Sequence, residues 1–489
     1  MIPVTENTEK QGKETSHDRR LTVVVFSLFF SWLLAFPFEG QVLYAITDFH
    51  GVSAQSFVFG AMAAHFTGLL LCGFFVKNMQ MAKKLILFSI SFCIVASSVF
   101  FFPPSLFWYA ALYSASFFVG GCVAAWGFYF KSCTHKNERI KTIADGLIFS
   151  NLLMIILNMT AMHISPQIGL GFSILMLVLA FFFALWLPQA EMSKESKKQS
   201  TNAPDTVSSG KFAALMFLCF FIVVITINSG LMYHVVNPAF AHMELLTSFY
   251  WAVPYIAALL IMRNLPRKVS RSYSLYVAIA MIGISFILFI LLKHTWADYL
   301  LVNTLMLGAC GVYDLFWWSI LGDMLELDKN PAIIIGIGLS ANVLGVLLGG
   351  LIANAINVTG GQIQNHNHIF LALGVVCVTL ILLPPLHNRL AKLLKNHAYL
   401  TTFIEMPKKE QTQIIRKFEL NEPLTTRENE VMNLLIQGKS YKVIAGELYI
   451  SENTVGTHAR NIYAKAGITN RVELMNLLMN LPDFPSESK

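Results

Sequence analysis

Long apolar runs alternate with short polar segments over the first 385 positions of the chain. Each run approaches the roughly 20 helical residues that cross the hydrocarbon core of a bilayer. The pattern therefore predicts an all-α protein with a polytopic membrane domain of twelve spans. Their expected ranges are 21–46, 56–76, 85–103, 105–130, 142–163, 167–187, 211–235, 245–262, 272–292, 298–322, 331–357 and 367–385.

A polar segment at 188–210, rich in Ser, Lys and Glu, divides these spans into two sets of six. Its composition predicts a flexible linker between a first half at 21–187 and a second half at 211–385. Spans in the second half begin at a nearly constant offset from their counterparts, and residues 119–122 are echoed at 307–310. This offset predicts an internal duplication.

Composition separates the chain into two kinds of domain. Hydrophobic residues make up 55% and charged residues 13% of the whole, and the mean hydropathy is +0.59. Most of this apolar weight precedes the last hundred residues, which read as soluble protein. The seven cysteines form no CxxC pair, so we expect neither a zinc site nor a disulfide framework. With no nucleophile motif either, we expect no catalytic residues, no metal and no cofactor, and a protein that is not an enzyme.

The distribution of Lys and Arg predicts the topology. The formal charge is +7, and nearly all basic residues that flank the spans fall in the N-terminal tail (1–20) and in the loops on its side. The loops on the other side hold only Lys293. By the positive-inside rule the N-terminus is cytoplasmic, and an even number of spans returns the C-terminus to the same side. The run after Arg19 and Arg20 is long, so we interpret it as a first span rather than a cleaved signal peptide.

Two repeated halves about an axis normal to the membrane are the plan of the major facilitator transporters, which this part of the chain resembles. The loop between spans two and three, residues 77–84, keeps the basic charge of that superfamily. It lacks the Gly and Asp that usually accompany the charge and that help the family switch between open states. This departure favours a sensing role over transport.

A small helical domain is predicted at 424–481, after a juxtamembrane helix and connector at 386–423 and before a short tail at 482–489. Thr425 and Glu428 form a predicted capping box that opens the first helix. Ser440 and Ser451 are expected to cap the second and third helices, and Gly467 to end the third. A second capping box, Asn470 with Glu473, is expected to open a fourth helix. The middle pair is then a helix-turn-helix.

This domain resembles the LuxR-type DNA-binding domain. The matching pieces are residues 424–431, 444–445, 450–455, His458 and 461–463. The resemblance implies that the third helix enters the major groove of double-stranded DNA and that the protein is bacterial. Val455, Ala459, Ile462 and Ala466 fall on one face of that helix and are expected to be core. From the other face and by resemblance, the predicted DNA-binding residues are Lys442, Asn453, Thr454, Thr457, His458, Arg460, Asn461 and Lys465.

One position departs from the LuxR pattern, because Gly456 stands where the family commonly carries Lys. Basic residues in the domain barely outnumber acidic ones, so a single copy is expected to bind weakly. The resemblance implies a homodimer on a two-fold site, with the fourth helix as the contact.

Ionisable and polar groups at membrane depth are candidates for a ligand pocket. Pockets of the facilitator type are lined by spans one, four, seven and ten, which here offer Glu39, Trp126, Asn228 and Asp314. Asp145 is interpreted as interfacial, and the glycines of span eleven as sites of close helix packing.

Together these features predict a regulator in the bacterial inner membrane whose DNA binding responds to a cue, an unidentified small molecule, sensed by the spans. The alternative is a working secondary transporter with a fused regulatory DNA-binding domain. A purely anchoring role is a weaker third interpretation, since one span would suffice for it.

Overall fold

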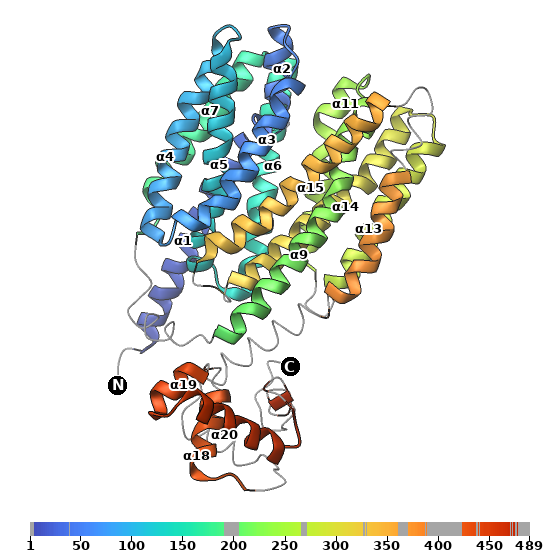
Figure 1. Cartoon of the computed structure of the whole chain (residues 1–489). Coiled ribbons are helices and arrows are strands. Elements are labelled where there is room, and N and C mark those ends of the chain that lie inside the picture. Colours follow the sequence, from blue (N-terminus) through green and yellow to red (C-terminus); the bar gives the residue numbers. More distant parts are fainter. Residues whose placement is uncertain are drawn as a thin grey trace. The chain divides into compact units, whose positions relative to one another are not determined.

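The structure is a computed structural model that describes residues 4–38, 40–189, 205–265, 271–325, 328, 330–359, 370–386, 388, 423–436, 439, 441–469, 471, 473–474 and 477. Over these residues the chain forms helices and turns and no strand (Figure 1). It divides into two compact units, residues 1–191 with 217–384 and residues 192–216 with 385–489.

The larger unit is built from long apolar helices. The first half contains α1 (Val4–Ala35), α2 (Gln41–Phe49), α3 (Gln55–Phe75), α4 (Met79–Ser98), η1 (Val99–Phe101), α5 (Leu106–Ser132), η2 (Lys136–Glu138), α6 (Arg139–His163) and α7 (Pro166–Leu185). The second contains α9 (Asp205–Leu231), η4 (Met232–Val236), α10 (Asn237–Ala239), α11 (Glu244–Phe249), η5 (Tyr250–Ala252), α12 (Val253–Arg263), α13 (Arg271–Leu291), α14 (Trp296–Met324) and α15 (Pro331–Thr359).

Ten helices among the described residues are long and apolar enough to cross a membrane, and this is a membrane protein. Two further apolar helical segments coincide with the first and last predicted spans. They are the apolar part of α1 and the shorter helix Phe370–Leu386. Pro103 and Pro104 separate η1 from α5, as the predicted turn between spans three and four requires.

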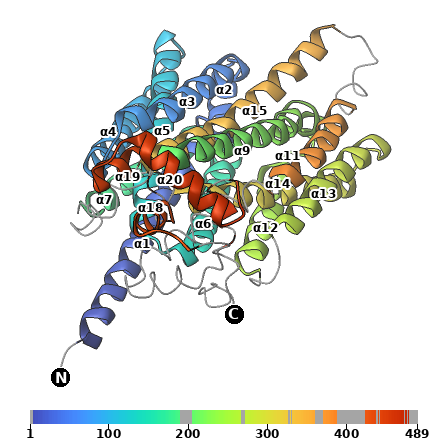
Figure 2. The same cartoon turned by 60° about the horizontal axis from the view of Figure 1, so that its bottom comes forward.

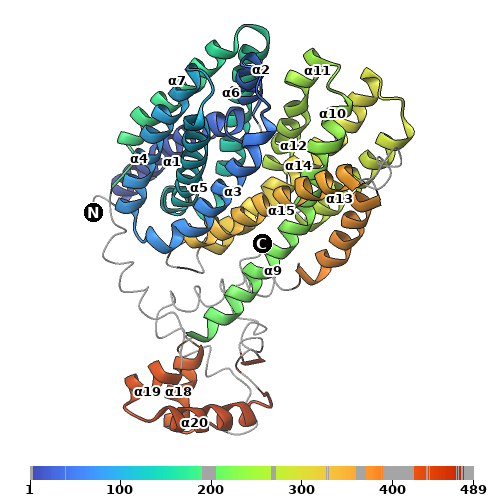
Figure 3. The same cartoon turned by 45° about the horizontal axis from the view of Figure 1, so that its top comes forward.

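The two halves have the same helix packing, and the contacts between them are related by an approximate two-fold symmetry. The pairs α3–α5 and α4–α5 in the first half correspond to α12–α14 and α13–α14 in the second. Between the halves, α15 packs on α3 and α5 just as α6 packs on α12 and α14. Figures 1 and 3 show the blue-to-teal half beside the green-to-orange half, with α15 reaching across. The duplication expected from the sequence is thus present in the packing.

Three predicted spans are not regular α-helices throughout. The first, predicted at 21–46, is interrupted, because α1 ends at Ala35 and α2 begins at Gln41. Pro37 lies in this break, where its missing N–H and its ring prevent the helix from continuing. The seventh span ends in the π-helical turn η4, and the eighth is assembled from α11, η5 and α12. Helix α9 also begins at Asp205, within the predicted linker.

Close packing explains the glycines of α15. A Cβ added at Gly345 would lie 1.9 Å from Oγ1 of Thr226, and one added at Gly349 would lie 2.3 Å from the carbonyl oxygen of Ile227. The backbones of α9 and α15 approach each other too closely for a side chain there, as small residues allow in membrane helices.

The smaller unit contains α18 (Thr426–Ile436), α19 (Tyr441–Leu448) and α20 (Glu452–Lys465), which cluster together in Figure 2. Residues 471, 473–474 and 477 are also helical, and the rest of the predicted fourth helix lies outside the described residues. So does most of the predicted juxtamembrane segment. The helices enclose one apolar core, made of Val431, Met432, Leu435, Ile436, Ile444, Ala445, Val455, Ala459, Ile462, Tyr463 and Leu474.

Candidate functional site

The start of the helix-turn-helix domain carries the predicted capping box. The backbone N–H of Thr425 donates to Oε2 of Glu428 at 2.8 Å, and the N–H of Glu428 donates to Oγ1 of Thr425 at 3.2 Å. Ser451 caps α20, because its Oγ accepts a hydrogen bond from the N–H of Thr454 at 3.1 Å. Gly467 adopts a φ of 65°, the left-handed conformation that ends a helix at little cost to glycine. These three local predictions are confirmed.

Helix α20 has one buried face and one exposed face. Val455, Ala459 and Ile462 are fully buried in the core, as predicted, while Ala466 is half-buried. The predicted DNA-binding residues Asn453, Thr454, Thr457, Arg460 and Asn461 are exposed, and His458 is half-buried. An exposed polar helix face held by a rigid core is the arrangement with which a helix-turn-helix reads the major groove.

Several cations of this domain are engaged inside it. Nζ of Lys465 donates to Oε2 of Glu428 at 2.8 Å and to the carbonyl oxygen of Pro423 at 3.1 Å. Lys439 pairs with Glu447 at 2.6 Å. Arg427 pairs with Glu430 and donates to the carbonyl oxygen of Leu448, and Arg471 donates to that of Lys439 at 3.0 Å. The structure does not describe the side chain of Lys442, which belongs to α19.

Glu428 joins the start of the domain to the end of α20. Its side chain is 5% exposed, and burial alone would raise the pKa of the carboxyl. The hydrogen bonds from Lys465 and Thr425 outweigh burial and lower that pKa from 4.5 to about 2. The carboxylate is therefore ionised at neutral pH and holds Lys465 against the first helix. Sequence spacing did not reveal this contact, since the two residues are far apart in the chain.

The second predicted capping box is only partly within the described residues. Asn470 lies outside them, but both carboxylate oxygens of Glu473 bond Thr469, with the N–H of Thr469 at 2.7 Å from Oε2. Glu473 thus caps one residue earlier than expected.

A cavity of about 540 Å³ lies between the two halves of the membrane unit. Its described walls come from spans one, two, four and five and from their counterparts seven, eight, ten and eleven. The break between α1 and α2 contributes Phe38 and Gln41, the π-helical turn η4 contributes Met232 and Tyr233, and the 3-10 turn η5 contributes Trp251. Broken helices at a central site are typical of membrane transporters, and π-helical turns often lie at functional sites.

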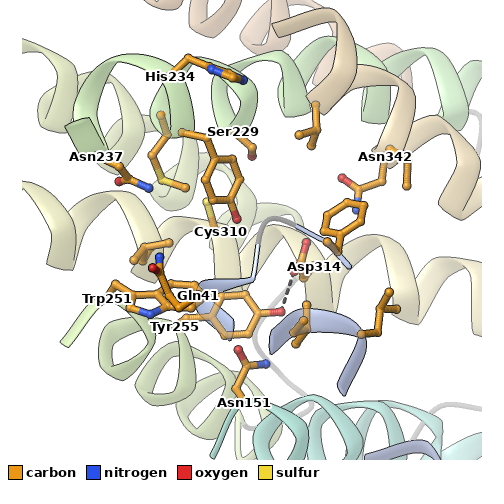
Figure 4. Close-up of a pocket in the computed structure, with 18 of the residues that line it drawn as sticks. Gln41, Asn151, Ser229, His234, Asn237, Trp251, Tyr255, Cys310, Asp314 and Asn342 are labelled. Carbon is orange, nitrogen blue, oxygen red and sulfur yellow. Dashed lines mark hydrogen bonds between the residues drawn. The ribbon is translucent and has the colours of Figure 1, made fainter. Parts of the chain in front are cut away.

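The structure brings one of the four predicted pocket residues to this cavity. Asp314 on α14 lines the cavity. Its Oδ2 accepts a hydrogen bond from the hydroxyl of Tyr255 on α12 at 2.6 Å (Figure 4). Trp126 is instead buried in an aromatic cluster, stacked on Phe130 at 5.0 Å between ring centroids. Asn228 is 3% exposed and does not line the cavity, and Glu39 lies outside the described residues.

Other lining residues were missed by sequence reasoning. Figure 4 shows Asn151, Trp251, Tyr255 and Asn342 around the same space as Asp314. An aromatic or amide side chain in an apolar span has no sequence signal that separates it from a packing residue. The resemblance to facilitator pockets pointed to the span that contains Asp314, and spans eight and eleven follow once the two-fold packing is known.

Polar contacts join the halves near the start of α6. Oδ1 of Asp145 accepts from Nε of Arg263 at 2.5 Å, and Oδ2 accepts from Nη2 of Arg19 at 2.9 Å. Nη1 of the buried Arg139 donates to the carbonyl oxygen of Gly322 at 2.7 Å. We call Arg19, Arg139, Asp145 and Arg263 the polar clamp. Asp145 thus bridges helices, which its interfacial interpretation had not included.

Comparison with known proteins concerns the two units separately. Residues 422–478 match the family model described as bacterial regulatory proteins, luxR family. The chain is 41% identical over 69 residues to the spore germination protein GerE of Bacillus subtilis, a match that covers 14% of this chain and 93% of that protein. The chain belongs to the luxR family. The luxR domain thus contains the helices α18, α19 and α20 of the smaller unit, and it is a DNA-binding domain of transcription regulators.

Other relatives share this domain alone. The chain is 47% identical over 53 residues to the monoamine regulon transcriptional regulator of Klebsiella aerogenes, covering 11% of this chain and 23% of that one. It is 42% identical over 59 residues to the HTH-type transcriptional regulator MalT of Serratia proteamaculans, covering 12% and 6%. The chain therefore spans less than a quarter of each of these two regulators.

The membrane unit has the fold of a major facilitator transporter. The human organic anion transporter MFSD10 (TETRAN) superposes with a TM-score of 0.57, at 14% sequence identity, over 75% of this chain and 99% of that one. At this identity the likeness concerns the fold. A transporter-like membrane domain and a luxR domain are thus joined in one chain.

Proposed function

We propose that this protein is a membrane-embedded transcriptional regulator whose luxR domain binds DNA under the control of a small molecule sensed by the transporter-like spans. The observation that carries the proposal is the presence, in one chain, of an exposed recognition helix and a central membrane cavity walled by both halves. Each supplies one half of a one-component sensor, a ligand site and an output.

On the DNA side, Asn453, Thr457, Arg460 and Asn461 are proposed to reach bases or phosphates from the exposed face of α20. Thr454, His458 and Lys442 are proposed to contact the backbone beside them. Lys465 is proposed to act next to the DNA while its ammonium holds the end of α20 on Glu428.

We propose that the protein binds DNA as a homodimer, because one copy is expected to bind weakly. Since Lys439 and Lys465 form internal ion pairs, little free positive charge is left for phosphates. Two copies on a two-fold site double the contacts, and the fourth helix is the proposed contact between them.

On the sensing side, a ligand shifts an equilibrium only by its differential affinity for two states. The cavity is lined by both halves, including the break between α1 and α2 and the turns η4 and η5, so a change in how the halves pack changes the site. Asp314 is the proposed ligand contact. The loop at 77–84 lacks the Gly and Asp of the facilitator pattern, which favours sensing over transport.

The experiment measures DNA occupancy by the full-length protein in cells, with candidate small molecules present and absent. Asp314→Asn is expected to lock transcription on or off, or to blunt its response, while protein level and membrane insertion stay unchanged. Loss of regulation only in step with loss of the folded protein would show that Asp314 is structural.

Uptake of a labelled inducer by vesicles containing only this protein, abolished by the same substitution, would instead support the alternative of a working transporter. We further propose that the protein lies in the bacterial inner membrane with both termini in the cytoplasm, which the bias of Lys and Arg supports.

A further inference from the structure

The described wall of the central cavity holds one acidic side chain and no strongly basic one. Among the described residues that line it, Asp314 is the one Asp or Glu, and no Lys or Arg accompanies it. The hydrogen bond to Asp314 comes from Tyr255, a neutral phenol. A carboxylate held away from water without a cation is costly, so a cation that enters this site is favoured.

Aromatic residues line the same cavity as that carboxylate. Tyr255 contacts Asp314 directly, and Trp251, Tyr299 and Trp318 also belong to the lining. Figure 4 labels Asp314, Tyr255 and Trp251. The face of a Trp or Tyr ring attracts ammonium groups, most strongly where the site is shielded from water. The same rings offer apolar area to the body of a ligand.

Two buried polar atoms on the wall lack a partner among the described residues. Nδ1 of His65 and Nε1 of Trp251 form no hydrogen bond, and His65 is 5% exposed. Buried polar atoms in native structures are usually hydrogen-bonded, so these two atoms are available to a polar group of a ligand. The amides of Asn151 and Asn342 add further polar contacts.

We propose that the cavity binds a small organic cation, with an amine or quaternary ammonium group at Asp314 and an apolar or aromatic body against Trp251 and Tyr255. The volume of about 540 Å³ lies in the range of sites for drug-sized molecules. The proposal rests on the proposed function and names the class of its ligand. MFSD10 is named as an organic anion transporter, whereas the described wall of the present cavity holds an acid and no Lys or Arg.

The test uses the full-length protein in lipid nanodiscs with two fluorescent probes of opposite charge. The cationic probe is 4-(4-dimethylaminostyryl)-N-methylpyridinium, and the anionic probe is 8-anilinonaphthalene-1-sulfonate. We expect saturable binding of the cation that the anion does not displace. Asp314→Asn should weaken cation binding by about tenfold or more, and Asp314→Glu, which keeps the charge, should retain part of it.

Asp298→Asn is the matched control. It removes the same charge from the same helix, but Asp298 caps the start of α14 and does not line the cavity. This variant should bind the cation like the wild type. Thermal unfolding of each variant, followed by intrinsic fluorescence, identifies any that fails to fold, and Tyr255→Phe then replaces Asp314→Asn with a smaller expected loss.

Equal cation binding by the wild type and a folded Asp314→Asn variant would overturn the proposal. So would saturable binding of the anionic probe in preference to the cation. Neither result depends on DNA occupancy in cells, which is the measurement that tests the proposed function. Failure of this inference is therefore separable from failure of the proposed regulatory function.

Discussion

The carboxylate of Asp145 and the guanidinium of Arg263 meet across the boundary between the two halves of the membrane unit, with Oδ1 and Nε 2.5 Å apart. The same carboxylate bonds Arg19 at 2.9 Å, so one residue of α6 holds α1 and α12. Leu147, half a turn further along α6, lines the cavity. The carboxylate of Asp145 therefore lies nearer the start of α6 than the cavity does. The polar clamp ties together the helices that must separate if the cavity opens at the end of the bundle where α6 starts.

Arg263→Gln is expected to loosen this end of the bundle, because Asp145 then keeps only Arg19. Cys310 lines the cavity and provides a native reporter. We expect faster maleimide labelling of Cys310 in inside-out vesicles, measured by mass spectrometry of its peptide. Lys84→Gln removes an exposed cation from α4 and should leave the rate unchanged. Identical rates for wild type and Arg263→Gln would show that the clamp does not restrict access.

Substitutions on the exposed face of α20 are expected to weaken DNA binding. Arg460→Ala and Thr457→Ala should each weaken the free energy of binding to a two-fold operator by about 1–3 kcal/mol, which raises the dissociation constant. Fluorescence anisotropy with a dimerised fragment from residue 415 measures this. GerE is covered over 93% of its length by the matched residues, which supports a fragment of this size folding alone. Asn429→Ala, on α18, is the control; if all three variants bind equally, α20 is not the reading element.

Acid is expected to destabilise the luxR domain through Glu428. The folded-state pKa of about 2 lies below the ordinary 4.5, so this stabilisation is complete above pH 4.5 and is lost as pH falls toward 2. Urea unfolding of the fragment at pH 7 and pH 3 should show the decline. Glu428→Gln should cost about 2 kcal/mol at pH 7 and flatten this dependence. Glu430→Gln, at an exposed pair, should keep the wild-type slope.

Gly456→Ala is expected to stabilise the luxR domain by about 0.5–1 kcal/mol, since glycine disfavours the interior of a helix. There is room for the methyl group, because an added Cβ would lie 3.6 Å from the Tyr441 ring. Gly467→Ala is the opposite case, since its φ of 65° strains any other residue, and it should destabilise. Chemical denaturation compares the two. A loss of stability in Gly456→Ala would contradict the assignment.

Topology is tested by labelling from outside intact cells. A cysteine placed at Asn365 should react with a membrane-impermeant maleimide, and one placed at Ser200 should not. The expected asymmetry follows from the bias of Lys and Arg. Reaction at Ser200 in intact cells would reverse the proposed orientation.

Local sequence determined much of what could be predicted. The box formed by Thr425 and Glu428 joins residues three apart, and Ser451 caps its own helix, so both are visible without a structure. Asp314 stood out as an acid within an apolar run. The duplicated halves followed from a constant offset that the paired helix contacts reproduce.

Contacts between distant segments were beyond such reasoning. Lys465 has the appearance of a free DNA-binding cation in the sequence, whereas its ammonium meets Glu428 near the start of the domain. The role of Tyr255 could not be predicted from the sequence, because it depends on the packing of α12 against α14. The π-helical turn Met232–Val236 has an ordinary apolar composition, since its backbone register is decided by packing.

Internal pairing of Lys439 and Lys465 bears on how the regulator searches the chromosome. Affinity for arbitrary DNA grows with the number of phosphates that free cations neutralise, and it falls steeply with salt as that number grows. A domain with few free cations releases non-target DNA quickly and shows a shallow salt dependence. Under the proposed function this would be an advantage, because a strongly basic domain held at the membrane would bind passing stretches of DNA at random, whereas a domain with few free cations would retain only a sequence that its recognition helices fit.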